Sequence, residues 1–326
     1  MATCYHPMLG VRSLTPNPDT GKYPVKVFKG VDYTPEFVKK YGEENIVSIP
    51  CGRCIGCRLR YSRIWADRCM AEASLYKDNI FLTLTYNDDN LPPCNKMLDG
   101  QVSPVHPLVK RDLQLFIKRL RKALPDQKIR YFACGEYSPK LRPHYHLIIF
   151  NIKLDDLQLL YRNDSQFKYY TSKTISDCWK YGFHIIADCN WHTCAYTARY
   201  IVKKQKGETS YVYEKYNYPP EFTLMSRKPG IGKEYFEQHA VDIYYGGAFL
   251  STEDGHLRIL PNKYYDSLFD IEYPDASVVL NDDKKKIMKV NDELRSNLTS
   301  MSYTSMLESE ENYKISRSKA LKRKEV

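Results

Sequence analysis

The chain has 326 residues, 43% of them hydrophobic, which is the composition of a globular protein with one large or two ordinary domains. No segment approaches the roughly 18 consecutive apolar residues that a membrane helix needs, and residues 1–7 do not begin a secretory signal. We therefore expect a protein of a reducing cytoplasm with no membrane partner. In that compartment, clustered cysteines indicate metal binding more than disulfides.

Lys and Arg outnumber Asp and Glu, which gives a formal net charge of +10. A basic chain favours a polyanionic partner, because its binding releases counterions from a nucleic acid. The chain also contains 28 tyrosines against 12 phenylalanines, and tyrosine can both stack on bases and form hydrogen bonds. An ordinary solvated surface and a biased composition are the alternatives that the sequence leaves open.

Apolar periodicity predicts regular elements between residues 58 and 205. In chain order they are a helix at 58–76, a strand at 79–86, an amphipathic basic helix at 108–123, strands at 129–135 and 143–151, a helix near 172–180, a strand at 183–188 and a helix at 191–205. Residues 1–57 are predicted to be irregular. After residue 210 we expect a loop-rich region with short helices, ending in a basic tail that contains Lys322, Arg323 and Lys324.

The order of these elements predicts the fold class. Two adjacent strands form a hairpin, so the sheet should be mostly antiparallel with helices on one side, an α+β architecture of the ferredoxin-like kind. We expect three parts: a cysteine-rich region and helix at 1–76, a central domain at 77–210 and the loop-rich region with its basic tail at 211–326.

A histidine pair lies on the strand at 143–151. Strand side chains alternate between faces, so His144 and His146 share one face, about 7 Å apart along the strand, and can bind one metal ion. Glu136, at the end of the preceding strand, would be brought beside them by the hairpin. Two imidazoles and a carboxylate leave positions open for water and phosphate, which suits Mg²⁺ or Mn²⁺. The alternatives are packed or exposed histidines and a solvated glutamate.

A tyrosine pair lies on the helix at 191–205. Tyr196 and Tyr200 are four residues apart and share a helix face, with Lys203 and Lys204 close behind. A tyrosine hydroxyl has a pKa near 10 and needs activation to act as a nucleophile, which a nearby ammonium and a metal-polarised phosphate would provide. The alternative is an ordinary helix of a tyrosine-rich protein.

A cysteine cluster precedes the first predicted helix. Cys51, Cys54 and Cys57 follow a Cys-x2-Cys-x2-Cys pattern, and Cys4 or His6 could supply a fourth ligand to a structural Zn²⁺ ion. An iron–sulfur cluster uses similar spacing, and free thiols remain a further alternative.

Several short motifs occur together in a fixed order. They are Cys51-Gly-Arg-Cys-Ile-Gly-Cys57, Phe81-Leu-Thr-Leu-Thr-Tyr86, Gly135-Glu-Tyr137 followed by Arg142-Pro-His-Tyr-His146, Tyr196-x3-Tyr200-x2-Lys203-Lys204, and Met225-Ser-Arg-Lys-Pro-Gly-Ile-Gly232. With them the chain resembles the HUH superfamily of single-strand DNA endonucleases. More closely, it resembles the replication initiators of gokushovirus-type microviruses over roughly residues 45–235.

The resemblance implies a rolling-circle replication initiator with an HUH endonuclease fold. Such an initiator nicks single-stranded DNA at the origin, stays attached through a 5′-phosphotyrosine and later religates the strand. By position, His144 and His146 match the metal ligands, and the family's third ligand, here Glu136, varies. Tyr196 and Tyr200 match the nucleophiles, and Lys203 or Lys204 matches a supporting lysine.

The same resemblance implies partners and a location. They are a single-stranded DNA origin, a host helicase and DNA polymerase, and the cytoplasm of the bacterial host. No P-loop of the Gly-x4-Gly-Lys-Ser/Thr form occurs in the sequence, so unwinding is assigned to the host. Candidate phosphate contacts are the helix at 108–123, Arg58, Arg60, Arg142, Lys203, Lys204 and the basic tail.

Two other functions remain compatible with the sequence. One is a non-catalytic nucleic-acid-binding protein of ferredoxin-like fold, with the aromatic residues as a stacking platform. The other is a metal-dependent hydrolase that uses His144 and His146 but activates water instead of tyrosine.

Overall fold

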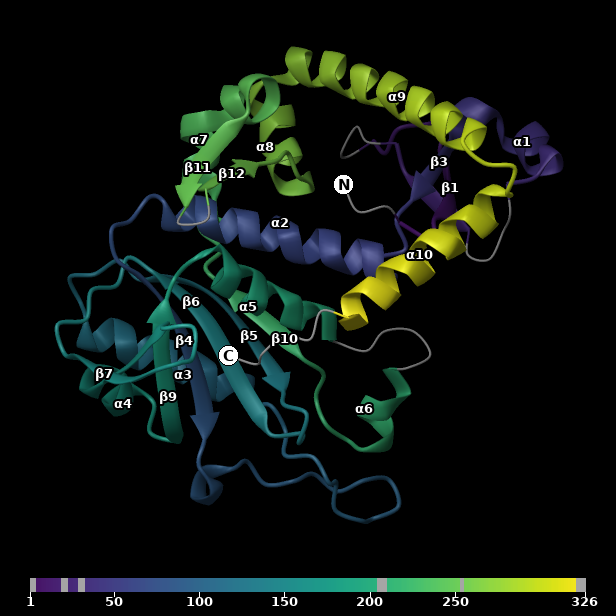
Figure 1. The fold of residues 1–326 in the computed structure, drawn as a ribbon. Coiled ribbons are helices and arrows are strands. Elements are labelled where there is room, and N and C mark those ends of the chain that lie inside the picture. Colours follow the sequence, from purple (N-terminus) through teal and green to yellow (C-terminus); the bar gives the residue numbers. More distant parts are fainter. Residues whose placement is uncertain (1–3, 19–22, 29–32, 204–209, 253–254, 321–326) are drawn as a thin grey trace. The chain divides into compact units, whose positions relative to one another are not determined.

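The computed structural model describes the chain except for residues 1–3, 19–22, 29–32, 204–209, 253–254 and 321–326 (Figure 1). The chain forms two compact units. The smaller comprises residues 1–60 and 278–326, and the larger comprises residues 61–277. The three predicted parts, 1–76, 77–210 and 211–326, do not coincide with these units.

The larger unit is built on a seven-stranded sheet with the order β10-β5-β6-β4-β9-β8-β7. All of its strand pairs are antiparallel. The strands are β4 (Asn79–Tyr86), β5 (Arg130–Tyr137), β6 (Pro143–Phe150), β7 (Leu157–Arg162), β8 (Lys168–Ser172), β9 (Gly182–Asp188) and β10 (Phe222–Met225). The four predicted strands, β4, β5, β6 and β9, form its centre in the ferredoxin-like order, which confirms the predicted α+β class.

The two faces of the sheet follow from the alternation of side chains in the central strands. In β4, Ile80, Leu82 and Leu84 pack into one hydrophobic core, whereas Phe81 packs into a second core on the opposite face. Because strand side chains point alternately to opposite faces, Thr83 and Thr85 share the face of Phe81. The same parity places the even-numbered residues of β6, including both histidines, on that face.

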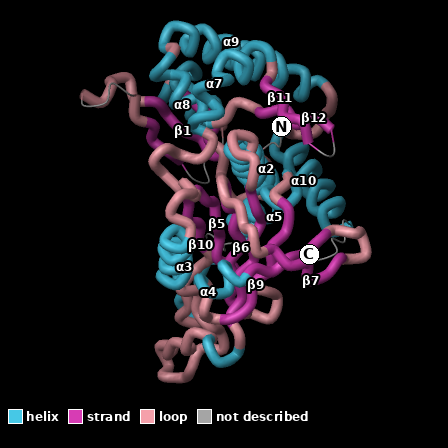
Figure 2. Tube along the Cα trace, turned by 90° about the vertical axis from the view of Figure 1, so that its left-hand side faces the viewer, coloured by secondary structure: helices cyan, strands magenta, loops and turns pink. Residues whose placement is uncertain are grey.

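Helices cover both faces of the sheet, and not one side only as predicted. The crossover helices α3 (Lys110–Ala123) and α4 (Lys173–Cys178) pack on the first core, as a ferredoxin-like sheet requires. Helices α2 (Ile55–Ala73) and α5 (Trp191–Lys203) contribute side chains to the second core. In Figure 2, α3 and α4 lie on one side of the strands and α5 on the other. The prediction missed this because both faces of the central strands are apolar.

The remaining elements of the larger unit were not predicted individually. They are α6 (Tyr211–Lys215), α7 (Lys233–Val241), β11 (Ala248–Thr252), β12 (Gly255–Ile259) and α8 (Lys263–Glu272). Strands β7, β8 and β10 were also missed. Strand β7 is exposed along its whole length at the edge of the sheet, so it has no alternation of apolar and polar residues to detect.

The smaller unit contradicts two predictions. Residues 1–57, expected to be irregular, form the three-stranded antiparallel sheet β2-β1-β3 and helix α1 (Pro35–Tyr41), which Thr34 caps through its side chain. Its strands are β1 (Met8–Arg12), β2 (Val25–Phe28) and β3 (Ile46–Ile49). The C-terminal region, expected to be loop-rich, contains the long helices α9 (Pro274–Asn297) and α10 (Tyr303–Ala320). Their apolar residues lack a clear helical stripe, which is why periodicity did not detect them.

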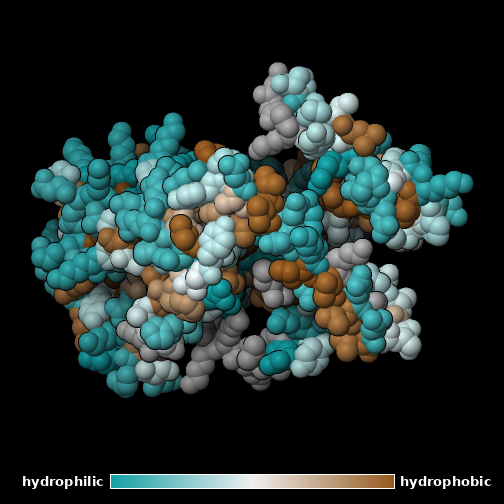
Figure 3. Space-filling model, turned by 90° about the horizontal axis from the view of Figure 1, so that it is seen from above, coloured by the Kyte–Doolittle hydropathy of each residue, from teal (hydrophilic) through white to brown (hydrophobic). Residues whose placement is uncertain are grey.

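Polar side chains dominate the surface. Figure 3 shows hydrophobic side chains only in several separate groups on the face in view. Helix α9 carries exposed apolar residues, among them Ile287, Val290, Leu294 and Leu298 just beyond its end. Within the described residues, no helix combines the length and the apolar character needed to cross a bilayer.

The sheet contains one buried titratable histidine whose protonation is coupled to folding. His184 of β9 accepts the Ser172 backbone N–H at Nε2, 3.0 Å away, and Nε2 also lies 3.0 Å from the Thr171 hydroxyl. Burial lowers the pKa of His184, although the charge of Asp156 opposes this. An unfolded histidine titrates near 6.5, so the stability that neutral His184 supports is present above that pH. It is lost as the pH falls through the folded-state pKa.

We therefore predict that the His184→Gln variant loses less stability than the wild type when the pH falls from about 7 to about 5. Glutamine keeps an acceptor for Ser172 but does not titrate. Urea unfolding at both pH values measures the difference. An equal loss of stability in the two proteins would contradict this assignment.

Candidate functional site

The two histidines lie on the central strand β6, on the face covered by α2 and α5. His144 is half-buried and His146 is buried. Strand β4 pairs with β6 so that Thr83 lies opposite His146 and Thr85 opposite His144. The Thr83 Oγ1 atom lies 3.0 Å from His146 Nδ1, and Thr85 Oγ1 lies 2.9 Å from His144 Nδ1. Each imidazole is thus fixed through Nδ1, which leaves Nε2 to face the site.

Glu136 reaches the histidines from β5. The hairpin register sets Glu136 opposite His144, and its carboxylate contacts the diagonal neighbour His146, with 2.8 Å between Oε1 and Nε2. Both side chains are about 5% exposed. A lone pair on Nε2 would repel the carboxylate at this distance, so a proton on the ring or a bound cation is required between them. The predicted approach of Glu136 to the histidine pair is therefore seen in the structure.

The donor atoms allow a test of whether a divalent cation fits. In an octahedral site with metal–ligand distances of about 2.1 Å, neighbouring ligand atoms are about 3 Å apart. The 2.8 Å between His146 Nε2 and Glu136 Oε1 is close to that value. The two histidines and Glu136 do not form a group with all donor atoms within 4.8 Å of one another, a spacing that four cysteines reach in the described part of the chain. Ligation by His144 as well therefore needs a side-chain adjustment.

Tyr196 of α5 lies directly over this group. Its half-buried ring meets the His146 imidazole edge to face, with 5.3 Å between the ring centroids and an interplanar angle of 83°. Phe81 stacks on the other side of His146 at 5.9 Å and also contacts Tyr196. The structure thus brings together a histidine, a glutamate and a tyrosine that are separated by up to 60 residues of chain.

Helix α5 is held in place at its N-terminus. Asn190 and Thr193 exchange side-chain hydrogen bonds to backbone N–H groups of 2.9 and 3.0 Å, which caps the helix. The Trp191 indole N–H donates to Asp67 of α2 over 3.2 Å. Burial raises the pKa of Asp67, and the hydrogen bond from Trp191 and the charge of Arg63 oppose that rise. These contacts fix the position of Tyr196 one and a half turns further along the helix.

The other tyrosine-helix residues are described less fully. The backbone of α5 continues to Lys203, so Tyr200 lies about one turn beyond Tyr196. The side chains of Tyr200 and Lys203 and the whole of Lys204 lie outside the described residues, as does the basic tail that contains Lys322, Arg323 and Lys324.

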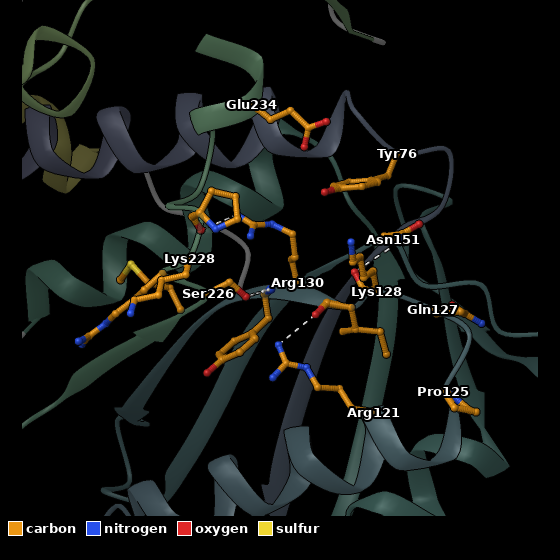
Figure 4. A pocket seen from close by; sticks show the side chains of 15 residues that line it. Tyr76, Arg121, Pro125, Gln127, Lys128, Arg130, Asn151, Ser226, Lys228 and Glu234 are labelled. Carbon is orange, nitrogen blue, oxygen red and sulfur yellow. Dashed lines mark hydrogen bonds between the residues drawn. The ribbon is translucent and has the colours of Figure 1, made fainter. Parts of the chain in front are cut away.

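A basic pocket of about 1060 Å³ lies elsewhere on the larger unit, by the start of β5 and the end of β10 (Figure 4). Five of its lining residues are cationic and one, Glu234, is acidic. The cationic residues are Arg121, Lys128, Arg130, Arg227 and Lys228. Arg130 is paired with Glu72, and Arg121 donates to the Ile129 carbonyl over 3.0 Å. Lys128, Arg227 and Lys228 are exposed.

The segment 226–232, which lines this pocket, is anchored to α2. Arg68 lies between the rings of Trp65 and Tyr264, with its guanidinium carbon 4.2 and 4.0 Å from their centroids, and donates to the Ile231 carbonyl. Glu72 accepts the Gly232 N–H over 2.7 Å. These buried charges make the loop a rigid support for the exposed Arg227 and Lys228.

The predicted phosphate contacts are distributed over the molecule. Helix α3 packs on the sheet face opposite the histidines, and of its basic residues only Arg121 lines the pocket. Arg142 donates to the Tyr86 carbonyl over 2.7 Å and to Asp88 over 2.8 Å, which ties the β5–β6 hairpin to the end of β4. Arg58 and Arg60 belong to the smaller unit. Their roles in DNA binding remain predictions.

The smaller unit brings together the cysteine cluster. The Sγ atoms of Cys4, Cys51, Cys54 and Cys57 all lie within 4.8 Å of one another. His6, the alternative fourth ligand, instead hydrogen-bonds Glu311 through Nε2 at 2.5 Å. Burial raises the pKa of Cys4 and of Cys57. Burial also opposes ionisation of Cys54, but hydrogen bonds from the Cys57 and Tyr5 backbone N–H groups lower the pKa of Cys54 to about 7.

Sequence reasoning did not find the roles of Thr83 and Thr85 or the basic pocket. The alternation in Phe81–Tyr86 contained a signal for the threonines, because both share one strand face. Nothing in the sequence paired that strand with β6, so the contact with the histidines could not be derived. The pocket joins residues from several separate segments, and only the motif Met225–Gly232 pointed to it.

Fold and site together define an α+β protein with a ferredoxin-like sheet that presents two histidines and a glutamate beneath a tyrosine-bearing helix. A family model of replication-associated proteins of the ORF2 type matches residues 79–205, which run from the start of β4 to just beyond α5. All the residues of this site lie within that match.

Comparison with known proteins then identifies the family. The chain is 36% identical to the replication-associated protein ORF2 of Spiroplasma virus 4 over 81% of each chain. It is 32% identical to the replication-associated protein VP4 of Bdellovibrio phage phiMH2K over 67% of each chain. It is 29% identical to the replication-associated protein ORF4 of Chlamydia phage 1 over 48% of this chain and 38% of that protein. No solved structure gives a significant match.

The chain therefore belongs to the family of replication-associated proteins of gokushovirus-type microviruses. The resemblance inferred from its motifs is confirmed.

Proposed function

We propose that the chain initiates rolling-circle replication by nicking single-stranded DNA at an origin and later religating it through tyrosine transesterification. Its membership of a replication-associated family supports a role in DNA replication. The single observation that carries the proposed chemistry is the position of Tyr196, whose ring lies 5.3 Å from the His146 imidazole above Glu136.

In this proposal His144, His146 and Glu136 hold a divalent cation, Mg²⁺ or Mn²⁺. When bound, the ion would polarise a non-bridging phosphate oxygen and stabilise charge that develops on phosphorus. Thr83 and Thr85 orient the two imidazoles, and their hydrogen bonds to Nδ1 keep each ring from rotating away. The half-buried His144 and Tyr196 leave the site open to substrate on one side, whereas His146 and Glu136 form its buried floor.

The covalent step exchanges one phosphate ester for another. The Tyr196 hydroxyl oxygen bonds to phosphorus and loses its proton, the bond from phosphorus to the 3′ oxygen breaks, and that oxygen leaves as a 3′-hydroxyl after taking up a proton. Because one ester replaces another, the bond energy is retained in the 5′-phosphotyrosine. Attack by a 3′-hydroxyl on that phosphotyrosine reverses the step and rejoins the strand.

Tyr200 would supply the second nucleophile. A second cleavage before the first link is resolved requires two tyrosines, and Tyr200 follows Tyr196 by about one turn on α5. Lys203 or Lys204 would stabilise the tyrosinate. A host helicase and DNA polymerase would open and copy the strand, in the cytoplasm of the bacterial host.

The basic pocket would hold the backbone of the DNA strand away from the cleavage site. Lys128, Arg227 and Lys228 are exposed cations on a supported loop and strand start. Tyr76 and Tyr131 add aromatic surface to the same pocket, which suits single-stranded nucleic acid.

We predict that the wild type with Mn²⁺ or Mg²⁺ forms a covalent adduct with a single-stranded origin oligonucleotide. The double variant Tyr196→Phe/Tyr200→Phe should form none, because phenylalanine has no hydroxyl to bond to phosphorus. Denaturing gels with labelled oligonucleotide measure the adduct, and Tyr245→Phe, at an exposed position of the same unit, is the matched control.

The outcomes separate the three candidate functions. Cleavage that persists in the double tyrosine variant would replace this proposal with a hydrolase that activates water. Binding without any cleavage or adduct in the wild type would leave the non-catalytic nucleic-acid-binding function.

We predict that Glu136→Gln weakens Mn²⁺ binding by about 10- to 100-fold, because the amide keeps the shape but loses the charge that a cation requires. Isothermal titration calorimetry with Mn²⁺ measures the affinity. Glu221→Gln changes a carboxylate on the same unit that bonds Tyr213 instead, and should leave Mn²⁺ binding unchanged. Equal affinities for wild type and Glu136→Gln would exclude Glu136 as a ligand.

We also predict that Lys128→Gln/Lys228→Gln weakens binding of single-stranded DNA. Two lost phosphate contacts should reduce the slope of log affinity against log salt by about 1.4. Fluorescence anisotropy over a salt series measures this slope. The control Lys118→Gln/Lys122→Gln removes the same charge from α3, where both lysines lie away from the pocket, and a larger effect in the control would assign the strand to α3.

A further inference from the structure

The four clustered cysteines come from two separate stretches of the smaller unit. Cys4 lies near the N-terminus, whereas Cys51, Cys54 and Cys57 lie in the loop before α2 and in its first turn. All four Sγ atoms lie within 4.8 Å of one another, and all four residues are buried or half-buried. Because a chance encounter of free thiols does not gather four sulfur atoms from segments 47 residues apart, this arrangement indicates a ligand set.

The backbone around the cluster is arranged for negatively charged sulfur. Cys54 Sγ accepts the N–H groups of Tyr5 and Cys57, each over 3.4 Å. Cys51 Sγ accepts the N–H groups of Arg53 and Cys54 over 3.4 and 3.3 Å, and Cys4 Sγ accepts that of Cys51 over 3.2 Å. The loop can turn its N–H groups inward because Gly52 adopts a φ of 69°, which only glycine tolerates readily.

Apolar and charged groups of the same unit close the cluster from outside. Tyr5 and Leu307 of α10 are buried against the cysteines. Glu311, one turn further along α10, accepts the Ile55 N–H over 3.4 Å and bonds His6. The N-terminal segment, the start of α2 and α10 therefore meet at this point.

We propose that Cys4, Cys51, Cys54 and Cys57 bind one Zn²⁺ ion in a tetrahedral site that is structural, and that this ion joins the N-terminal segment to the start of α2 beneath α10. Zn²⁺ prefers four thiolates at about 2.3 Å, which sets the sulfur atoms about 3.8 Å apart. The observed limit of 4.8 Å fits this tetrahedron. With four protein ligands the ion has no open position, so it has no part in the DNA chemistry proposed above.

Two other fates of the thiols differ in geometry. An iron–sulfur cluster places its cysteines around several iron and sulfide atoms, so their sulfur atoms lie farther apart than around a single ion. Disulfides would pair the sulfur atoms two by two at about 2 Å, and all ten cysteines are free. One ion shared by four thiols accounts for the mutual closeness of the whole set.

The metal content of the full chain, purified under reducing conditions, tests this site. Elemental analysis should find about one zinc per chain, and a mercurial reagent should release it, as a colorimetric zinc indicator reports. The Cys54→Ser/Cys57→Ser variant should lose most of the zinc. The control Cys94→Ser should keep it, since Cys94 lies outside the cluster and hydrogen-bonds His106.

A second measurement avoids variants that fail to fold. Exchange of the wild-type protein with Co²⁺ should give the visible absorption of tetrahedral cobalt with four thiolates and intense sulfur-to-cobalt charge-transfer bands. Each of three results would overturn the proposal: no bound metal and no such spectrum, iron as the bound metal, or a cysteine pair in the cluster recovered as a disulfide. Neither measurement depends on DNA cleavage, so the outcome is independent of the proposed function.

Discussion

The antiparallel pairing of β4 with β6 sets Thr83 against His146 and Thr85 against His144, and the geometry of the site depends on it. A shift of one residue in this register would turn both histidines to the face of α3. Both strands lie in the centre of the sheet and are buried on both faces. Because the whole core would have to repack for the register to change, the hydrophobic interior fixes the orientation of two imidazoles.

The site is then completed from outside the strand pair. Strand β5 supplies Glu136 through a short hairpin in which the Ser138 N–H donates to the Arg142 carbonyl over 2.9 Å. Helix α5 supplies Tyr196, and the bond from Trp191 to Asp67 ties that helix to α2. A preorganised floor of buried polar groups with a tyrosine above it is what an in-line attack on phosphorus needs, because little reorganisation is left for the reaction itself.

Much of this could be predicted from the sequence where the signal was local. Period-two alternation located β4, β6 and β9, and the same rule placed His144 and His146 on one face. The α+β class followed from the order of elements. The pairing of Thr83 with His146 could not be derived, because it depends on which strands become neighbours, a property of the folded chain.

Other parts lay beyond local patterns. Cys4 and His6 were equal candidates for the fourth ligand of the cysteine cluster, and only the fold, which engages His6 with Glu311, separates them. The short strands β1, β2 and β3 are at most five residues long and only partly buried, so they carry little periodicity. Strand β7 is exposed at the edge of the sheet. Contacts distant in sequence decide such elements, and single-chain patterns do not record them.

The central claim is that a tyrosine of α5 becomes covalently bound to the DNA. Peptide mapping of the protein–oligonucleotide adduct by mass spectrometry tests it directly. Trypsin cuts after Arg199 and so separates Tyr196, in peptide 181–199, from Tyr200, in peptide 200–203. We predict a nucleotide phosphate on Tyr196 or Tyr200. A phosphate link on any other residue, or DNA that is cleaved without a linked peptide, would contradict this claim.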